Sequence, residues 1–152
     1  MSGVTQKCQY ALRAVFELAL RQADEPFVGV TEIAEAQDIP QRFLELILNQ
    51  LRQAGFVTSR RGQRGGYTLA VDPAKLTVGE IIRCMDGPIH PVKCISEDGG
   101  HDKCPLRGRC AFTGLWVRAR DAIAGVYDAT TFKELVEEYR ASKGKHVLDY
   151  CI

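Results

Sequence analysis

Apolar residues recur every three or four positions near the start of the chain, which is the spacing of one face of a helix. This pattern predicts an amphipathic helix over residues 5–21, with Pro26 and Gly29 following it. Thr31 is a suitable N-cap, because its hydroxyl oxygen can accept a hydrogen bond from the first turn of a short helix over residues 31–36. The apolar positions of the first helix are Leu12, Val15, Leu18 and Ala19.

A third helix is predicted over residues 40–54. Pro40 is suited to the start of this helix and Gly55 to the position after its end. Its apolar face would hold Phe43, Leu44, Ile47, Leu48 and Leu51. Its polar face would hold Gln41, Arg42, Glu45, Asn49 and Gln53. We therefore expect one face of this helix to lie on a core and the other to meet solvent or a ligand.

Two strand-like stretches, residues 56–60 and 67–71, follow and are joined by a Gly- and Arg-rich segment. They predict a short β-hairpin. A helix, a short helix, a turn, a helix and a hairpin, in this order, are typical of a winged helix-turn-helix. The predicted fold class is mainly α with a small β-hairpin wing.

The second half of the chain predicts further helices around a long loop. Two Thr-x-x-Glu patterns fit a capping box and predict helix starts, one at Thr77 with Glu80 and one at Thr131 with Glu134. Residues 87–110 are rich in glycine, proline and charge, and are expected to form a loop. A wide apolar stripe predicts a helix from residue 111, and residues 144–152 are expected to form a flexible tail.

The chain of 152 residues carries 20 basic and 19 acidic side chains, a net charge of +1 that gives no global sign of a nucleic-acid partner. No apolar run approaches the ~20 residues of a membrane-spanning helix, so no membrane partner is expected. The first residues lack the pattern of a signal peptide, which favours the cytoplasm. Locally the charge is unbalanced, because no acidic residue lies between Gln50 and Val71. That stretch contains Arg52, Arg60, Arg61 and Arg64.

These arginines make double-stranded DNA the expected partner. Arginines on a hairpin tip, here Arg60, Arg61 and Arg64, can reach phosphates or a narrow minor groove. The preceding helix can lie in the major groove with its first residues at the base edges. There Gln41 can pair with adenine, Arg42 with guanine, and Glu45 can accept from a cytosine amine. The alternatives are a solvated hairpin in another kind of domain, or a winged helix that binds protein.

Six cysteines are the second chemical signal, and Cys94, Cys104 and Cys110 lie close together on the predicted loop. Such a cluster in a reducing compartment is more often a metal or redox site than a disulfide framework. Three thiolates at this spacing can hold an iron–sulfur cluster or zinc. A fourth ligand could be Cys8, or less favourably Gln9 or His101. The alternatives are unligated thiols, or a redox regulator or an enzyme that uses the same loop with zinc or a reactive thiol.

Several segments together resemble the IscR/NsrR regulators, the Rrf-two family. They are residues 10–19 (YALRAVFELA), 30–57, 59–70 (SRRGQRGGYTLA) and 76–89, together with the three-cysteine loop. The resemblance covers nearly the whole chain. The family has a histidine three residues after the last cysteine, where this chain has Thr113. An acidic residue near the N-terminus of other members aligns with Gln9.

The resemblance implies a homodimeric winged-helix transcription factor, not an enzyme, and more often a repressor. Members use a two-iron or four-iron cluster to sense redox state, nitric oxide, iron or cluster supply, and Cys94, Cys104 and Cys110 match the expected ligands. The helix from residue 111 to 127 would be a long dimerisation helix, with Leu115, Trp116, Ala119, Ile123 and Val126 at the interface. The implied organisation is a DNA-binding domain (residues 1–86), a sensor loop (87–110), dimerisation helices (111–143) and a tail (144–152).

Overall fold

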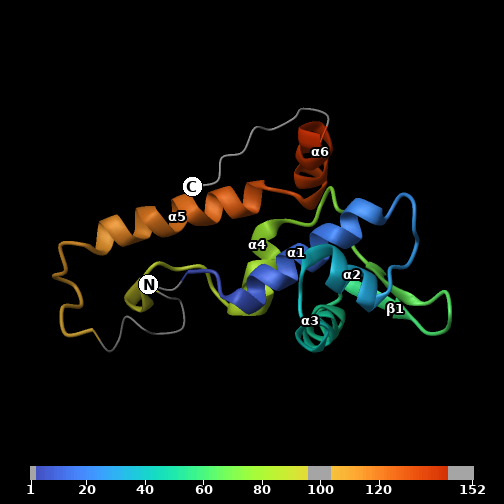
Figure 1. Ribbon diagram of the computed structural model, residues 1–152. Helices are drawn as coiled ribbons and strands as arrows, with labels where there is room; N and C mark the ends of the chain where they lie inside the picture. The colour runs from blue at the N-terminus through green and yellow to red at the C-terminus, as the bar shows by residue number, and fades with distance from the viewer. Residues whose placement is uncertain (1–2, 96–103, 144–152) are drawn as a thin grey trace.

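The computed structural model describes residues 3–95 and 104–143. The predicted tail and the candidate ligand His101 lie outside the described residues. The elements in chain order are α1 (Gln6–Arg21), α2 (Val30–Gln37), α3 (Gln41–Gln53), β1 (Val57–Arg60), β2 (Gly66–Leu69), α4 (Val78–Asp86), the short 3-10 helix η1 (Lys93–Ile95), α5 (Thr113–Ala129) and α6 (Phe132–Lys143). Figure 1 shows α2, α3, α4 and α6 gathered around α1, with the hairpin at one edge of this body and α5 extending away from it.

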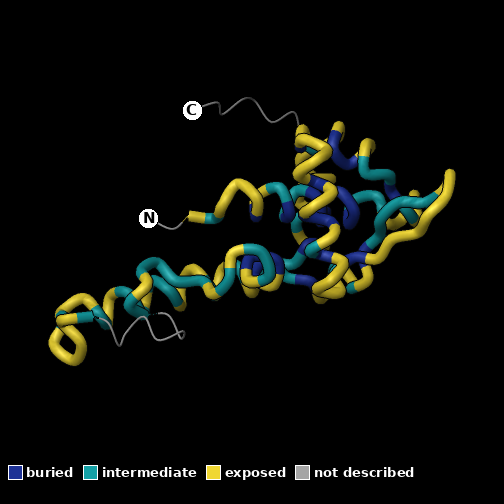
Figure 2. Tube along the Cα trace, turned by 90° about the horizontal axis from the view of Figure 1, so that it is seen from below, coloured by how far each residue is buried: buried dark blue, intermediate teal, exposed yellow. Residues whose placement is uncertain are grey.

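The core lies around α1, which contacts α2, α3, α4 and α6. Fully buried side chains come from α1 (Leu18), α3 (Leu44 and Leu48) and α6 (Phe132). In Figure 2 the buried positions concentrate in this body, and no described residue of α5 is buried. The body with its hairpin is thus the stable unit, and α5 projects from it.

The predicted α3 is confirmed, but Phe43 does not belong to its buried face. Leu44, Ile47, Leu48 and Leu51 form that face. Phe43 is 60% exposed, because it lies beside the row of buried positions on α3 and not within it. Glu17 of α1 is buried although it is charged and is not one of the apolar positions predicted for its helix. Its carboxylate accepts hydrogen bonds from Arg21 of α1 and Gln37 of α2, which satisfies the charge.

Two of the three predicted caps have the expected hydrogen bonds. The amides of Glu80 and Glu134 donate to the hydroxyls of Thr77 and Thr131, at 3.3 and 3.2 Å. The third prediction is wrong, since Thr31 lies inside α2, which begins at Val30. Gly29 has no capping side chain, and its amide donates instead to the Glu32 carboxylate at 2.8 Å.

The hairpin is a wing anchored to the chain before α2. Its strands pair antiparallel from Val57 opposite Leu69 to Arg60 opposite Gly66. Val28 and Tyr67 exchange two backbone hydrogen bonds of 2.9 and 2.8 Å, which form an isolated antiparallel bridge between this segment and β2. Gly66 makes this approach possible, because a Cβ there would lie 2.4 Å from the Val28 carbonyl oxygen. We use "the wing" below for residues 57–69.

Helices α5 and α6 have different attachments to the body. The guanidinium of Arg83 in α4 donates to both carboxylate oxygens of Asp128 in α5, at 2.6 and 2.8 Å. Helix α6 packs on α1, where the Phe16 and Tyr139 rings meet edge to face with centroids 5.3 Å apart. The predicted grouping of residues 111–143 as one dimerisation unit remains a prediction, and within this chain α6 shares the core of α1.

Candidate DNA interface and cysteine segment

The first turns of α3 present the predicted base-reading residues to solvent. Gln41, Arg42 and Glu45 are all exposed. The Gln41 amide nitrogen donates to a Glu45 carboxylate oxygen at 3.2 Å, and the Thr31 hydroxyl lies 3.4 Å from the Gln41 amide oxygen. Short contacts therefore connect α2 to the polar face of α3 and hold two of the three residues together. Thr31, expected as a cap, belongs to this surface.

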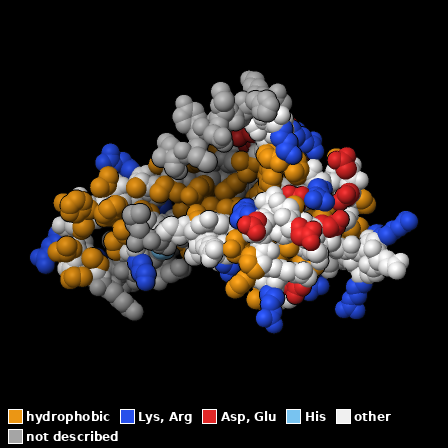
Figure 3. Space-filling model, viewed as in Figure 1, with side chains coloured by type: hydrophobic (Ala, Val, Ile, Leu, Met, Phe, Trp, Pro, Cys, Tyr) orange, Lys and Arg blue, Asp and Glu red, His pale blue; other side chains and the backbone are white. Residues whose placement is uncertain are grey.

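The three arginines predicted for the wing have different environments. Arg61 and Arg64 are exposed in the segment between the strands. The Arg60 guanidinium instead lies over the Phe27 ring, 4.3 Å from its centroid, and donates to the Arg64 carbonyl oxygen at 2.8 Å. Figure 3 shows Lys and Arg side chains projecting from the wing beyond the body. Arg60 thus makes contacts inside the wing region, whereas Arg61 and Arg64 are placed for an external partner.

Phe27 is a residue that the sequence pattern did not single out. It follows Pro26 in the connection before α2, and only the packing of the wing on this connection brings it to Arg60. Phe27 and Arg60 are more than thirty positions apart, so no local sequence pattern predicts their contact. Its only sequence trace is that Phe27 is the one aromatic residue of residues 22–29.

The three loop cysteines are all half-buried and none is in a disulfide. Cys94 lies in η1, and Cys104 and Cys110 lie between the undescribed residues and α5. Within residues 3–95 and 104–143, no three His, Cys, Asp or Glu side chains gather as a group that could hold a metal ion. The thiols fit an iron–sulfur cluster as donors, but this chain's described residues do not converge on one point.

Cys8 has an environment that disfavours a ligating thiolate. It is fully buried in α1. Its pKa is raised to about 12, first by burial and then by the charge and hydrogen bond of nearby Asp86. Cys84 is half-buried and burial raises its pKa as well. The side-chain amide of exposed Gln9 donates to the Val4 carbonyl at 3.0 Å. Cys8 is therefore best understood as a core residue of this chain.

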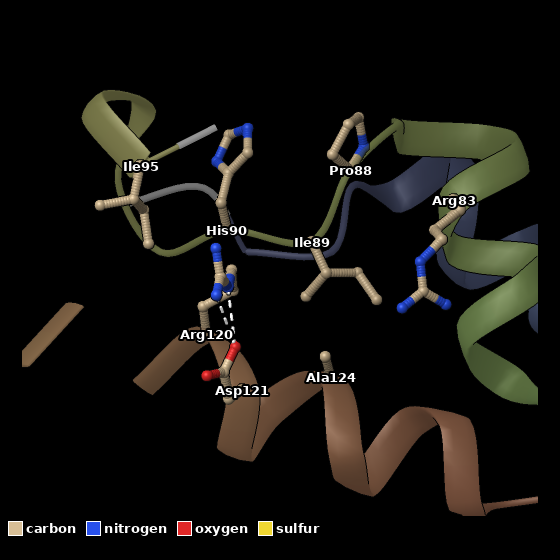
Figure 4. Close-up of a pocket in the computed structure, with 8 residues that line it drawn as sticks. All are labelled: Arg83, Pro88, Ile89, His90, Ile95, Arg120, Asp121 and Ala124. Carbon is tan, nitrogen blue, oxygen red and sulfur yellow. Dashed lines mark hydrogen bonds and ion pairs between the residues drawn. The ribbon is translucent and has the colours of Figure 1, made fainter. Parts of the chain in front are cut away.

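A pocket of about 450 Å³ separates the middle of α5 from α4 and the segment after it. Figure 4 shows Arg83 reaching in from α4, Ile89 and His90 from the connecting segment, and Arg120 paired with Asp121 on α5. The Nδ1 atom of His90 is buried and has no hydrogen-bond partner within the part of the chain that the structure describes. Helix α5 therefore contacts α4 through the Arg83–Asp128 pair, while a pocket lies between its middle and the segment after α4.

The outward side of α5 is apolar and open. Leu115, Ile123 and Val126 are 46%, 40% and 64% exposed, while Trp116 and Ala119 are half-buried. Single exposed apolar residues are common on proteins, but several along one helix mark an interaction surface. Among the described residues, no helix is long and apolar enough to cross a membrane.

A helix-turn-helix with an anchored wing and exposed arginines defines a winged-helix DNA-binding protein. The family model described as "Rrf2: Iron-dependent Transcriptional regulator" matches residues 4–138. The chain belongs to the Rrf2 family, which confirms the resemblance found in the sequence. It is a transcriptional regulator and not an enzyme, as its relatives are named for that role.

Two kinds of relative stand out in sequence and in structure. The regulator CymR of Bacillus subtilis is 36% identical, with 87% of this chain and 88% of CymR aligned. IscR of Photorhabdus laumondii is 33% identical over 88% of this chain and 78% of its own length. Among solved structures, B. subtilis CymR, titled the global cysteine regulator, has a TM-score of 0.73 at 34% identity, covering 91% of this chain and 98% of CymR. IscR from T. potens has a TM-score of 0.74 at 28% identity, covering 98% and 95%.

Proposed function

We propose that this chain acts as a homodimer that binds a palindromic operator and whose affinity is set by an iron–sulfur cluster on the cysteine segment. The observation that carries the DNA-binding part is the exposure of Gln41, Arg42 and Glu45 on α3 beside a wing that presents Arg61 and Arg64. In this arrangement α3 enters the major groove and the wing reaches the backbone or the adjacent minor groove.

The dimer in this proposal forms through α5. Leu115, Ile123 and Val126 offer an apolar stripe that the described residues leave exposed. Dimeric winged-helix regulators place two recognition helices about 34 Å apart, one turn of DNA. Because α5 is joined to the DNA-binding body through Arg83 and Asp128, a shift of one dimer helix against the other would change that separation.

The cluster in this proposal is held by Cys94, Cys104 and Cys110. Three cysteine thiols on one segment are suitable donors, and a bound cluster would supply oxidation–reduction chemistry and iron atoms to which nitric oxide can bind. We assign the repressor role to this proposal as well.

A second candidate is a regulator that works without a cluster. The similarity to CymR, titled a cysteine regulator, favours it, as does the absence of a converged metal site within residues 3–95 and 104–143. Anaerobic purification followed by iron, zinc and sulfide analysis separates the two. Iron and sulfide in equal amounts support the cluster, stoichiometric zinc indicates a zinc-based regulator, and the absence of metal supports the second candidate.

Arg61→Ala is expected to weaken operator binding by about 1–3 kcal/mol. It should also reduce the slope of the log binding constant against log salt concentration by about one. The exposed guanidinium of Arg61 has the position on the wing from which a phosphate or the minor groove can be reached. Fluorescence anisotropy at several salt concentrations measures both quantities. Lys75→Ala removes an exposed charge before α4 and serves as the control. Wild-type affinity and an unchanged salt slope would exclude the wing from the interface.

Arg60→Lys and Phe27→Leu are expected to weaken operator binding to a similar degree, about two- to fivefold each. The lysine keeps the charge but loses the flat guanidinium over the ring, and the leucine removes the ring itself. The double variant should bind no worse than either single variant, because both changes break the same Arg60–Phe27 contact. Full binding by Arg60→Lys, together with loss in Arg60→Ala, would show that Arg60 contacts DNA by its charge.

A further inference from the structure

The solvent-facing side of α3 carries an apolar residue that the core does not use. Leu46 is 67% exposed in the middle of the helix. It comes four residues after Arg42 and three before Asn49, so these three side chains share one face. Because other residues already supply the buried face, Leu46 contributes little to packing within this chain. Phe43 on the same helix is 60% exposed as well, and exposed apolar residues that gather on one helix mark an interaction surface.

The surroundings of Leu46 are mixed rather than purely apolar. Leu46 and Phe43 form part of a groove of about 740 Å³ between α1 and α3, whose far wall includes Lys7 and Tyr10. Lys7 donates to the Gln50 side chain across this groove at 2.6 Å. In Figure 3, apolar and basic side chains adjoin at the lower edge of the molecule, where α3 lies. The centres of protein–protein interfaces are poor in charge, whereas major-groove surfaces combine charged and apolar groups.

We propose that Leu46 contacts the 5-methyl group of a thymine and thereby selects an A·T pair at one position in each half-site. This inference rests on the proposed function, in which α3 lies in the major groove. The thymine methyl is the apolar group that base pairs present there, and the other edges offer hydrogen-bond donors and acceptors. Gln41, Arg42 and Glu45 suit those polar edges. Leu46, one turn beyond Arg42, suits the methyl.

Deoxyuridine tests the contact without changing the protein, because it differs from thymidine only by the missing methyl. The probes are duplexes that the wild-type protein selects from random-sequence DNA, with each thymine replaced in turn. At one position per half-site, the replacement should weaken wild-type binding about fourfold, the value of burying one methyl group. Leu46→Ala should bind the thymine and deoxyuridine duplexes equally at that position. Gln53→Ala, on the same face in the last turn of α3, should keep the wild-type penalty.

The proposal is overturned if wild-type protein binds its selected duplex but no deoxyuridine replacement lowers the affinity. It is also overturned if Leu46→Ala keeps the wild-type penalty. If Leu46→Ala binds all duplexes like the wild type but loses its oligomeric state, Leu46 belongs to a protein interface instead. Failure of the proposed function is distinct, since no duplex would then be selected over random DNA and Arg61→Ala would have no effect.

Discussion

Replacing Cys94, Cys104 and Cys110 together by serine is expected to abolish the visible absorbance of protein purified without oxygen. Serine keeps the size of each side chain but is a poor ligand for iron, and a cluster needs thiolates at most of its positions. Iron and sulfide should fall from stoichiometric amounts to background in the same samples. Absorbance spectra and metal analysis of wild-type and triple-variant protein measure the change.

Cys84→Ser is the matched control, because Cys84 is half-buried on α4 and burial raises the pKa of its thiol. It should keep the wild-type spectrum. If the triple variant retains the chromophore, the three cysteines are not the ligands. If the wild-type protein has no chromophore, iron or sulfide, the cluster itself is excluded, while the DNA-binding predictions for Arg61 and Leu46 remain testable.

Phe132→Ala is expected to lower the free energy of unfolding by about 3–5 kcal/mol. Phe132 begins α6, and its ring is fully buried in the same core as α1. Removing it leaves a cavity that the surrounding helices can only partly fill. Urea denaturation followed by circular dichroism measures the loss.

The neighbouring Lys133→Ala is the control, because Lys133 is exposed and its ion pair with Glu137 is at the surface. A surface pair of this kind contributes at most about 1 kcal/mol. If Phe132→Ala unfolds at the same urea concentration as the wild type, α6 is not part of the DNA-binding core. The experiment therefore also tests whether α6 belongs to the core of the DNA-binding body, and not to a separate dimerisation unit over residues 111–143.

The fold was largely predictable because its signals are local. Apolar spacing located α1 and α3, and the capping boxes at Thr77 and Thr131 located the starts of α4 and α6. The errors arose where a particular side-chain contact, and not the residue type alone, decided the outcome. Thr31 has the right side chain for a cap, but Glu32 caps α2 from within the helix. Glu17 is charged, yet it is buried because Gln37 of α2 reaches its carboxylate.

The candidate site was predictable in kind but not in detail. The sequence pattern indicated a basic hairpin, but it treated Arg60 and Arg61 alike. Only the tertiary approach of Phe27 distinguishes them. Leu46 belonged to neither predicted face of α3, because it is apolar but lies outside the spacing of the buried positions. Its exposure became visible only once the direction of the buried face was fixed by packing.

The packing of α6 on α1 has a consequence for synthesis of the protein. These helices come from opposite ends of the chain, so a chain growing on the ribosome lacks part of its core until α6 has emerged. The cysteine segment precedes α6 and has by then been translated in full. A prematurely terminated chain that stops within this segment would lack Phe132 and would not form the stable fold. The core of the DNA-binding body is therefore complete only after residues that follow the cysteine segment have been translated.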